Sequence, residues 1–305
     1  MNSKTLNAYA KINPTLEITG KKENGFFSLA ISWHKISLFD TISVNLNNKA
    51  KGVFITSDNP SVPQKKHSEK NNCYKAVKKL ERFIQKKDPS FVMPGVEIHI
   101  WKKLPLSGGL GGSATNASAT LEALISLLKI PISFHEKNLL ASQVGHDCSF
   151  FCSGFAHALG EEISSQGVPM RPLPALEGHM IFVSPKIEIF SGNAYAGMHS
   201  VFQKIKKKYP SKKIESSFFS KTSLQEKTKY FCNHLELSQN TFLSYPLLKE
   251  IKKDLLSEGC LTALMSGSGS TLFGVVEQKT RAEKIENTLK KKYISCHIFT
   301  AEFLS

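Results

Sequence analysis

The sequence lacks paired cysteines and long apolar segments. Its six cysteines show no C-x-x-C spacing, so they predict reduced, mostly buried thiols rather than a disulfide framework or a zinc site. No uninterrupted apolar run reaches the ~18 residues that a membrane-spanning helix requires. The polar start Met1-Asn2-Ser3-Lys4 does not resemble the apolar core of a signal peptide. These absences predict a cytoplasmic protein with no membrane partner.

Acidic residues are also scarce. The 25 Asp and Glu residues stand against 40 Lys and Arg residues, which gives a formal net charge of +15. Such an excess would suit a nucleic-acid binder, because clustered cations release counterions from a phosphate backbone. The lysines are spread along the chain, however, without the interleaved aromatic residues that stack on single-stranded bases. We therefore expect a solvated, lysine-rich surface and no nucleic-acid partner, with attraction of an anionic substrate as an alternative.

The bulk composition is that of a folded protein. Hydrophobic residues make up 41% and charged residues 21% of the 305 residues, close to the averages for globular proteins. A chain of this length suggests two domains of about 150 residues each. No internal repeat is visible.

The first half of the chain contains both strand and helix patterns. Alternating apolar residues predict strands at 16–19, 41–46, 96–101 and 155–159. Apolar residues at helical spacing predict helices through 76–84 and 121–128. Ser133, with Glu136 three residues later, predicts the N-cap and capping box of another helix that stops at Gly145.

The chain changes character at a loop rich in Ser, Gly and Pro near residue 160. Beyond it, strands are predicted at 180–183, 261–264, 271–276 and 295–301, and helices at 246–256 and 281–292. This pattern predicts an α+β sandwich. We expect one domain at 1–160 and a second at 161–305.

The strongest chemical signal is the segment Pro105-Leu106-Ser107-Gly108-Gly109-Leu110-Gly111-Gly112-Ser113. Its glycines remove the Cβ atoms that would keep an anion away from the backbone amides, and a helix start adds unpaired N–H donors. No Gly-Lys-Ser/Thr ends the segment, so it is not a Walker A loop, and its spacing does not match a dinucleotide fingerprint. By itself it predicts an anion-binding loop, with a structural turn as the alternative.

Three further segments carry polar groups that could belong to a binding or catalytic site. Met265-Ser266-Gly267-Ser268-Gly269-Ser270 lies between two predicted strands and could be a hairpin turn. Ala10-Lys11-Ile12-Asn13 places Lys11 and Asn13 at alternate strand positions, where both face one site or merely solvent. Gly145-His146-Asp147 puts a carboxylate at a helix end, where a capping role is the alternative.

Together these four segments resemble the GHMP kinase family in order and spacing over nearly the whole chain. Lys102-Lys103-Leu104-Pro105 and Asn233-His234-Leu235-Glu236 add to the resemblance. It implies an α+β, two-domain fold with an N-terminal ribosomal-protein-S5-like domain and a C-terminal ferredoxin-like α/β sandwich. It also implies an ATP-dependent kinase that uses Mg²⁺ and phosphorylates a hydroxyl of a small molecule.

The resemblance also assigns roles to individual residues. Asp147 matches the catalytic base, and Lys11 matches the lysine that holds this carboxylate and the transferring phosphate. The residues implied for ATP are Lys102, Pro105, Ser107, Gly108, Gly109, Leu110, Gly111, Gly112, Ser113 and Thr115, with Ser113 and Thr115 as candidate Mg²⁺ ligands. Those implied for the substrate are Asn13, Phe26, Phe27, Gly267 and Ser268.

This sequence departs from the family pattern at the substrate side. Gly25-Phe26-Phe27 stands for the usual Gly-Tyr-His, which keeps aromatic stacking but loses an imidazole. His146 replaces a customary alanine beside the expected base. A kinase of the homoserine or mevalonate type and a non-catalytic ligand sensor are the alternatives. We expect a monomer or a weak homodimer.

Overall fold

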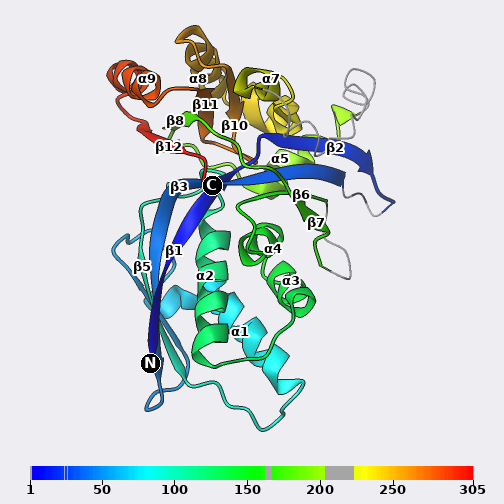
Figure 1. Cartoon of the computed structure of the whole chain (residues 1–305), viewed down its shortest axis with the longest axis vertical. Helices are drawn as coiled ribbons and strands as arrows, with labels where there is room; N and C mark the ends of the chain where they lie inside the picture. Colours follow the sequence, from blue (N-terminus) through cyan, green and yellow to red (C-terminus); the bar gives the residue numbers. More distant parts are fainter. Residues whose placement is uncertain (1, 24, 26, 162–166, 203–222, 305) are drawn as a thin grey trace.

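Two β-sheets organise the molecule in the computed structural model, which describes residues 2–23, 25, 27–161, 167–202 and 223–304. The larger sheet has eight strands and the smaller one has four. Figure 1 shows the larger sheet with α1 to α4 beside it and the smaller sheet at the opposite end with α8 and α9. The predicted α+β class is confirmed.

The long strand β3 (Phe27–Asn47) is the centre of the larger sheet. Its second half pairs antiparallel with β1 (Ser3–Ile12) and β5 (Gly95–Trp101). Its first half pairs with β2 (Thr15–Lys21) and β6 (His157–Glu161). The sheet therefore bends around one continuous strand, and Asn13-Pro14 separates β1 from β2 at the middle of it.

Shorter elements complete this sheet and its connections. β4 (Val53–Ser57) pairs parallel with β5, β7 (Met170–Pro172) pairs with β6, and β9 (Cys232–Asn233) pairs parallel with β2. The remaining short elements are η1 (Lys65–Lys70), α5 (Ser191–Ala196), α7 (Leu224–Thr228), η3 (His234–Leu237) and η4 (Gln239–Leu243). Because β7 and β9 belong to the larger sheet, a division of the chain at residue 160 does not separate the two sheets.

Four helices bury one face of the larger sheet: α1 (Asn72–Gln85), α2 (Gly112–Leu127), α3 (Phe134–Ser142) and α4 (His146–Cys152). α2 is buried along most of its length, and α1 and α4 pack on it. α3 begins with the predicted capping box, in which Ser133 and Glu136 bond to each other's backbone N–H groups. These helices fix the start of α2 against the sheet.

The smaller sheet has the order β10 (Thr262–Met265), β11 (Leu272–Val276), β8 (His179–Ser184) and β12 (His297–Glu302). α8 (Pro246–Ser257) and α9 (Lys279–Lys292) pack against one face. Ile181 and Val183 point toward this helical layer, whereas Met180 and Phe182 belong to the cluster shared with the larger sheet. Both faces are therefore buried, as the alternating register requires.

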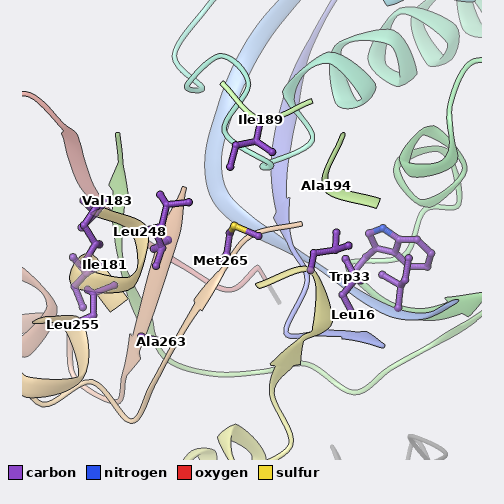
Figure 2. Packing of buried hydrophobic residues seen from close by; sticks show 14 of the residues in the cluster. Leu16, Trp33, Ile181, Val183, Ile189, Ala194, Leu248, Leu255, Ala263 and Met265 are labelled. Carbon is purple, nitrogen blue, oxygen red and sulfur yellow. The ribbon is translucent and has the colours of Figure 1, made fainter. Parts of the chain in front are cut away.

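A continuous apolar core joins the two sheets. Figure 2 shows Leu248, Leu255 and Ile181 at one end of this cluster and Leu16 with Trp33 at the other, with Met265 between them. Trp33 and Met265 are fully buried. None of the described helices is long and apolar enough to cross a membrane.

Candidate active site

A cleft of about 650 Å³ lies where segments from both halves of the chain meet. Its walls are the end of β1, the loop at 105–112 (the first glycine loop), the starts of α2 and α4, the segment 188–191 and part of the loop at 265–270 (the second glycine loop). Lys11, Asn13 and Asp147 all line it. The fold thus brings the four predicted segments to one place.

The first glycine loop needs its glycines for space and for backbone geometry. Gly109 and Gly111 have φ angles of 73° and 75°, in the left-handed region that favours glycine. A Cβ atom on Gly109 would collide with the carbonyl oxygen of Ser266, and one on Gly111 would lie 3.0 Å from Lys11 Cγ. α2 starts directly after Gly111, whose lack of a side chain leaves the first helical amides uncapped. These amides can hold an anion.

Lys11 connects this loop to the expected base. Its Nζ donates to the carbonyl oxygen of Gly109 at 2.8 Å and to Asn13 Oδ1 at 2.7 Å, and lies 3.5 Å from Asp147 Oδ2. Asn13 in turn donates to the carbonyl oxygen of Ser32 at 2.9 Å. Lys11 and Asn13 therefore face one site rather than solvent, which is one of the two alternatives that their alternation left open.

Asp147 lies in the first turn of α4, beside the N-cap Gly145. Its Oδ1 accepts a hydrogen bond from Trp33 Nε1 at 2.9 Å, while Oδ2 faces Lys11. Burial alone would raise the pKa of Asp147, but Lys11, His146 and the Trp33 bond together hold this pKa below its usual value. The carboxylate is ionised at neutral pH and its side chain remains 30% exposed to the cleft.

Lys102 lies beneath the first glycine loop and is held in place. Its Nζ donates to Asp40 Oδ2 at 2.8 Å and to the carbonyl oxygen of Leu104 at 2.7 Å. Asp40 is fully buried, and its Oδ1 accepts the backbone N–H groups of Lys103 and Leu104. Burial lowers the pKa of Lys102, although Asp40 partly offsets this effect. The pair anchors the start of the loop, and Lys102 also reaches the cleft wall.

The second glycine loop is the hairpin turn between β10 and β11, and it packs against the first. Ser266 Oγ donates to the carbonyl oxygen of Gly109 at 3.1 Å. Asn233 Nδ2 donates to the carbonyl oxygens of Met265 and Gly267, each at 2.7 Å. Gly267 and Ser268 line the cleft, and Ser268 Oγ lies 2.9 Å from Ser191 Oγ.

Comparison with known proteins shows to which family this chain belongs. The model for the GHMP kinases N terminal domain matches residues 71–155, and that for GHMP kinases C terminal matches 222–295. A 4-diphosphocytidyl-2-C-methyl-D-erythritol kinase of Clostridium tetani (strain Massachusetts / E88) is 30% identical over 96% of this chain and 98% of its own. The enzyme of that name from Caldanaerobacter subterraneus subsp. tengcongensis is 29% identical over 94% of this chain and 93% of its own. The chain belongs to the GHMP kinase family.

Solved structures of this GHMP kinase fold agree. A crystal structure of 4-(cytidine 5'-diphospho)-2C-methyl-D-erythritol kinase superposes with a TM-score of 0.72 at 21% identity, covering 99% of this chain and 100% of that one. L. major mevalonate kinase in complex with R-mevalonate gives 0.69 at 16% identity, with 99% and 97% covered. Both likenesses concern the fold. Membership of the family makes the chain a kinase and ATP its phosphoryl donor.

Two residues predicted to bind ATP, both in the first turn of α2, lie on different sides of this helix. Ser113 lines the cleft, and its Oγ accepts a hydrogen bond from Asn72 Nδ2 at 2.8 Å. Thr115 is 3% exposed and lines a different cavity on the far side of the helix. Residues two positions apart on a helix point about 200° apart, so Thr115 points away from the cleft, and its contact with ATP or Mg²⁺ stays a prediction. Asn116 reaches the cleft instead, and its Oδ1 is buried without a partner among the described residues.

One of the two aromatic residues predicted to contact the substrate, Phe27, does not lie at the cleft. Phe26 lies outside the described residues. Phe27 is 7% exposed, packs on His199 and Phe202 within the apolar core, and does not line the cleft. This position was predicted from a motif, whereas the side chain belongs to the apolar core cluster. Tyr195 lines the cleft with an aromatic ring instead.

Several residues of the site were missed by sequence reasoning. These are Trp33, Asp40, Asn72, Asn116 and Tyr195. Asp40 had a readable signal, since a carboxylate inside the apolar strand pattern of β3 indicates a buried pair. Trp33 lies 114 positions from Asp147, and nothing in the local pattern links the two. Burial raises the pKa of Tyr195, and Asp147 adds to this effect.

Proposed function

We propose that this kinase transfers the γ-phosphoryl group of ATP to the 2-hydroxyl of 4-diphosphocytidyl-2-C-methyl-D-erythritol, a step in non-mevalonate isoprenoid precursor biosynthesis. The observation that carries the proposal is the Lys11–Asp147 pair, which faces the first glycine loop across a single cleft. The substrate assignment draws on the full-length relatives that carry this enzyme's name. The cleft volume of about 650 Å³ falls within the range of small-molecule sites, about 300–1,000 Å³.

Asp147 is the residue that we assign to proton removal. As the acceptor hydroxyl attacks the γ-phosphorus, the bond from that phosphorus to the bridging oxygen of ADP breaks and the hydroxyl proton passes to Asp147 Oδ2. The low pKa of Asp147 keeps it ready to accept hydrogen bonds, and Trp33 fixes its orientation. Lys11 places a positive charge where negative charge gathers on the transferring group.

Lys11 also ties the reacting groups to the loop. Because its Nζ already bonds to the carbonyl oxygen of Gly109 and to Asn13, its ammonium is fixed before ATP binds. A fixed charge needs no reorganisation during the reaction. The uncapped amides of α2 would bind the remaining phosphates.

The cleft suits Mg²⁺ bound chiefly through ATP. Among the described residues there is no cluster of three or more His, Cys, Asp or Glu side chains that would hold a metal ion by themselves. Mg²⁺ commonly keeps several waters and takes only one or two protein ligands beside phosphate oxygens. Ser113 Oγ and the unpartnered Asn116 Oδ1 are the oxygens of this chain that we assign to it. It would supply charge neutralisation on the phosphates.

The test is an assay of ADP release by the purified protein with Mg-ATP and 4-diphosphocytidyl-2-C-methyl-D-erythritol. Homoserine and mevalonate, the acceptors suggested by the structural neighbours, serve as comparison substrates. We expect release only with the first compound. Release with homoserine or mevalonate alone would refute the substrate assignment while keeping the kinase.

The variant Asp147→Asn tests the assigned base. The amide preserves the side-chain shape and the bond from Trp33 but cannot take a proton, so kcat should fall by about 10²-fold or more. Affinity for an ATP analogue, measured by calorimetry, should remain nearly unchanged. Glu188→Gln, which alters a carboxylate elsewhere on the cleft wall, is the matched control and should retain turnover.

We include in this proposal a cytoplasmic location, a monomer or weak homodimer, and no nucleic-acid or membrane partner. Light scattering after size-exclusion chromatography would test the oligomeric state. A salt-dependent shift of labelled RNA or DNA would contradict the expected lack of nucleic-acid binding.

A further inference from the structure

A second cavity, of about 370 Å³, lies on the opposite side of α2 from the cleft. We call it the rear cavity. Thr115, Ser118, Ala119 and Glu122 of α2 form one wall, on a helical stripe that the cleft does not use, and β1 forms the facing wall. Among the residues that the structure describes, the two cavities share no lining residue. The rear cavity therefore requires an explanation apart from phosphoryl transfer.

The charge around the rear cavity is unbalanced. Lys35 projects into it from β3, with its Nζ 5.5 Å from the centre of the Phe150 ring. In the part of the chain that the structure describes, no carboxylate lies within ion-pair distance of this Nζ and no oxygen accepts a hydrogen bond from it. Burial lowers the pKa of Lys35, although Cys152 and Glu122 partly offset this effect. A half-buried ammonium without a counter-ion is costly, and an anion would offset the cost.

The other charges of the cavity do not supply this counter-ion. Glu122 is engaged by Lys137, with the ammonium nitrogen 2.7 Å from its Oε1. Within the described part of the chain, Lys4 has only a neutral partner, Ser126 Oγ at 2.8 Å. Of the described lining residues, two therefore carry positive charge that no carboxylate balances directly. Ala8, Ala119 and Phe151 give the cavity an apolar floor.

Phe151 connects the rear cavity to the active site. Its ring lines the rear cavity on one side and on the other packs against the first glycine loop, so that a Cβ on Gly111 would lie 3.0 Å from Phe151 Cζ. The Thr115 backbone N–H donates to the carbonyl oxygen of Gly111 at 2.8 Å, and its side chain lines the rear cavity. An occupant would thus restrain two groups that support the loop.

We propose that the rear cavity binds a small organic anion, a phosphate or carboxylate on a short apolar stem, and that its occupancy increases the affinity of the first glycine loop for ATP. The anionic group pairs with Lys35 and Lys4, and the stem lies on the apolar floor. Binding requires no phosphoryl transfer, so this inference and the proposed function can fail separately.

Calorimetry on the full-length protein tests the site. The ATP part of the cleft is first saturated with a non-hydrolysable ATP analogue and Mg²⁺, and the variants below separate binding in the rear cavity from binding in the acceptor part of the cleft. Butyl phosphate should then bind at one site per chain. Comparison with butyrate shows which anionic group binds more tightly, and comparison with inorganic phosphate shows whether the apolar stem contributes to affinity. Absence of saturable binding by all three compounds would overturn the proposal.

Variants locate the binding. Lys35→Met keeps the apolar stem but removes the charge and should weaken butyl phosphate binding at least tenfold, whereas Lys35→Arg should retain it. Lys279→Met removes an equal charge from an exposed position on α9 that lines neither cavity, and should change nothing. Equal affinity in Lys35→Met and the wild type would refute the site. Thermal melts establish that each variant is folded.

The coupling is measured without turnover. With butyl phosphate present, the ATP analogue should bind about fivefold more tightly or better, within the usual range of coupling between sites. By reciprocity, the analogue should tighten butyl phosphate binding by the same factor. Unchanged analogue affinity at saturating butyl phosphate would refute the regulatory part. If butyl phosphate increases the affinity for the ATP analogue in the wild type but not in Lys35→Met, both the anion site and its coupling to ATP binding are supported.

Discussion

The two glycine loops are both rich in glycine but differ in how their backbone hydrogen-bonding groups are used. The first, at 105–112, opens onto the uncapped start of α2, and its backbone faces the cleft. The second, at 265–270, is a hairpin whose carbonyl groups are held by Asn233 and whose Met265 N–H is held by Glu236. One loop leaves hydrogen-bonding groups for a ligand, whereas the other has its groups satisfied within the protein. Glycine content alone does not distinguish a binding loop from a supporting one.

The contact between the loops should give the largest effect. In Gly109→Ala the new Cβ would collide with the Ser266 carbonyl oxygen and would require the left-handed φ of 73°. The loops must separate, so we expect kcat/KM to fall by about 10²-fold, the usual cost of a misplacement near 1 Å. Strain of this kind costs about 1–3 kcal/mol of unfolding free energy, which urea denaturation would measure.

Gly192→Ala is the control for this variant. The added Cβ would meet no atom of the described residues within 4 Å, and the backbone there has no positive φ. Its activity should stay close to wild type. If Gly109→Ala were equally active, the first loop would not need its contact with the second.

Loss of the side chain that holds the second loop should have a smaller effect on catalysis. Asn233→Ala leaves the carbonyl oxygens of Met265 and Gly267 without their donor in a buried site. Each unsatisfied group costs about 1–3 kcal/mol, so the unfolding free energy should fall clearly in urea denaturation. If Gly267 and Ser268 contact the acceptor, as the family resemblance predicts, KM for the acceptor should rise more than KM for ATP.

Ser268→Ala serves as the comparison for Asn233→Ala. Of the side-chain hydrogen bonds between described residues, it removes only the exposed contact with Ser191 Oγ, and its stability should match the wild type. A Ser268 variant that lost as much stability as Asn233→Ala would show that the loop is held from the cleft side rather than from within.

Local patterns predicted most of the fold and part of the site. The capping box at Ser133, the order of strand, glycine loop and helix, and the meeting of Lys11 with Asn13 all depend on residues close in sequence. Periods of two and of 3.6 residues carry such information. The same helical period could have placed Thr115 behind α2, where the structure has it.

The remaining parts of the site depend on pairs far apart in sequence. Trp33 meets Asp147, Asp40 meets Lys102, and Asn233 meets the second loop. Such pairs are set by how β3 and the hairpin of β10 and β11 pack together, which no local period encodes. The place of Phe27 was not predictable for the same reason, because its ring packs on His199 and Phe202, which are far from it in sequence.

The carboxylates beside the two loops should differ in the sign of their pH response. The pKa of Asp147, near the first loop, is lowered from 3.8, because Lys11, His146 and Trp33 outweigh its burial. The pKa of Glu236, which supports the second loop, is raised from 4.5, because burial outweighs Lys252 and the Met265 N–H. NMR titration of the labelled side-chain carboxyl groups would measure both shifts directly.

These opposite shifts also predict opposite effects on stability. Asp147 stabilises the folded protein above pH 3.8, and this contribution is lost as pH falls through its lower folded pKa. Glu236 stabilises the fold below pH 4.5, and its contribution is lost as pH rises through its higher folded pKa. As pH rises from 3 to 6, the unfolding free energy of the wild type should therefore increase relative to that of Asp147→Asn and decrease relative to that of Glu236→Gln. Each unit of pKa shift corresponds to about 1.4 kcal/mol. If the stability difference from wild type changed with pH in the same direction for both variants, the two carboxylates would have pKa shifts of the same sign. The distinction between a binding loop and a supporting loop would then depend on hydrogen bonding alone.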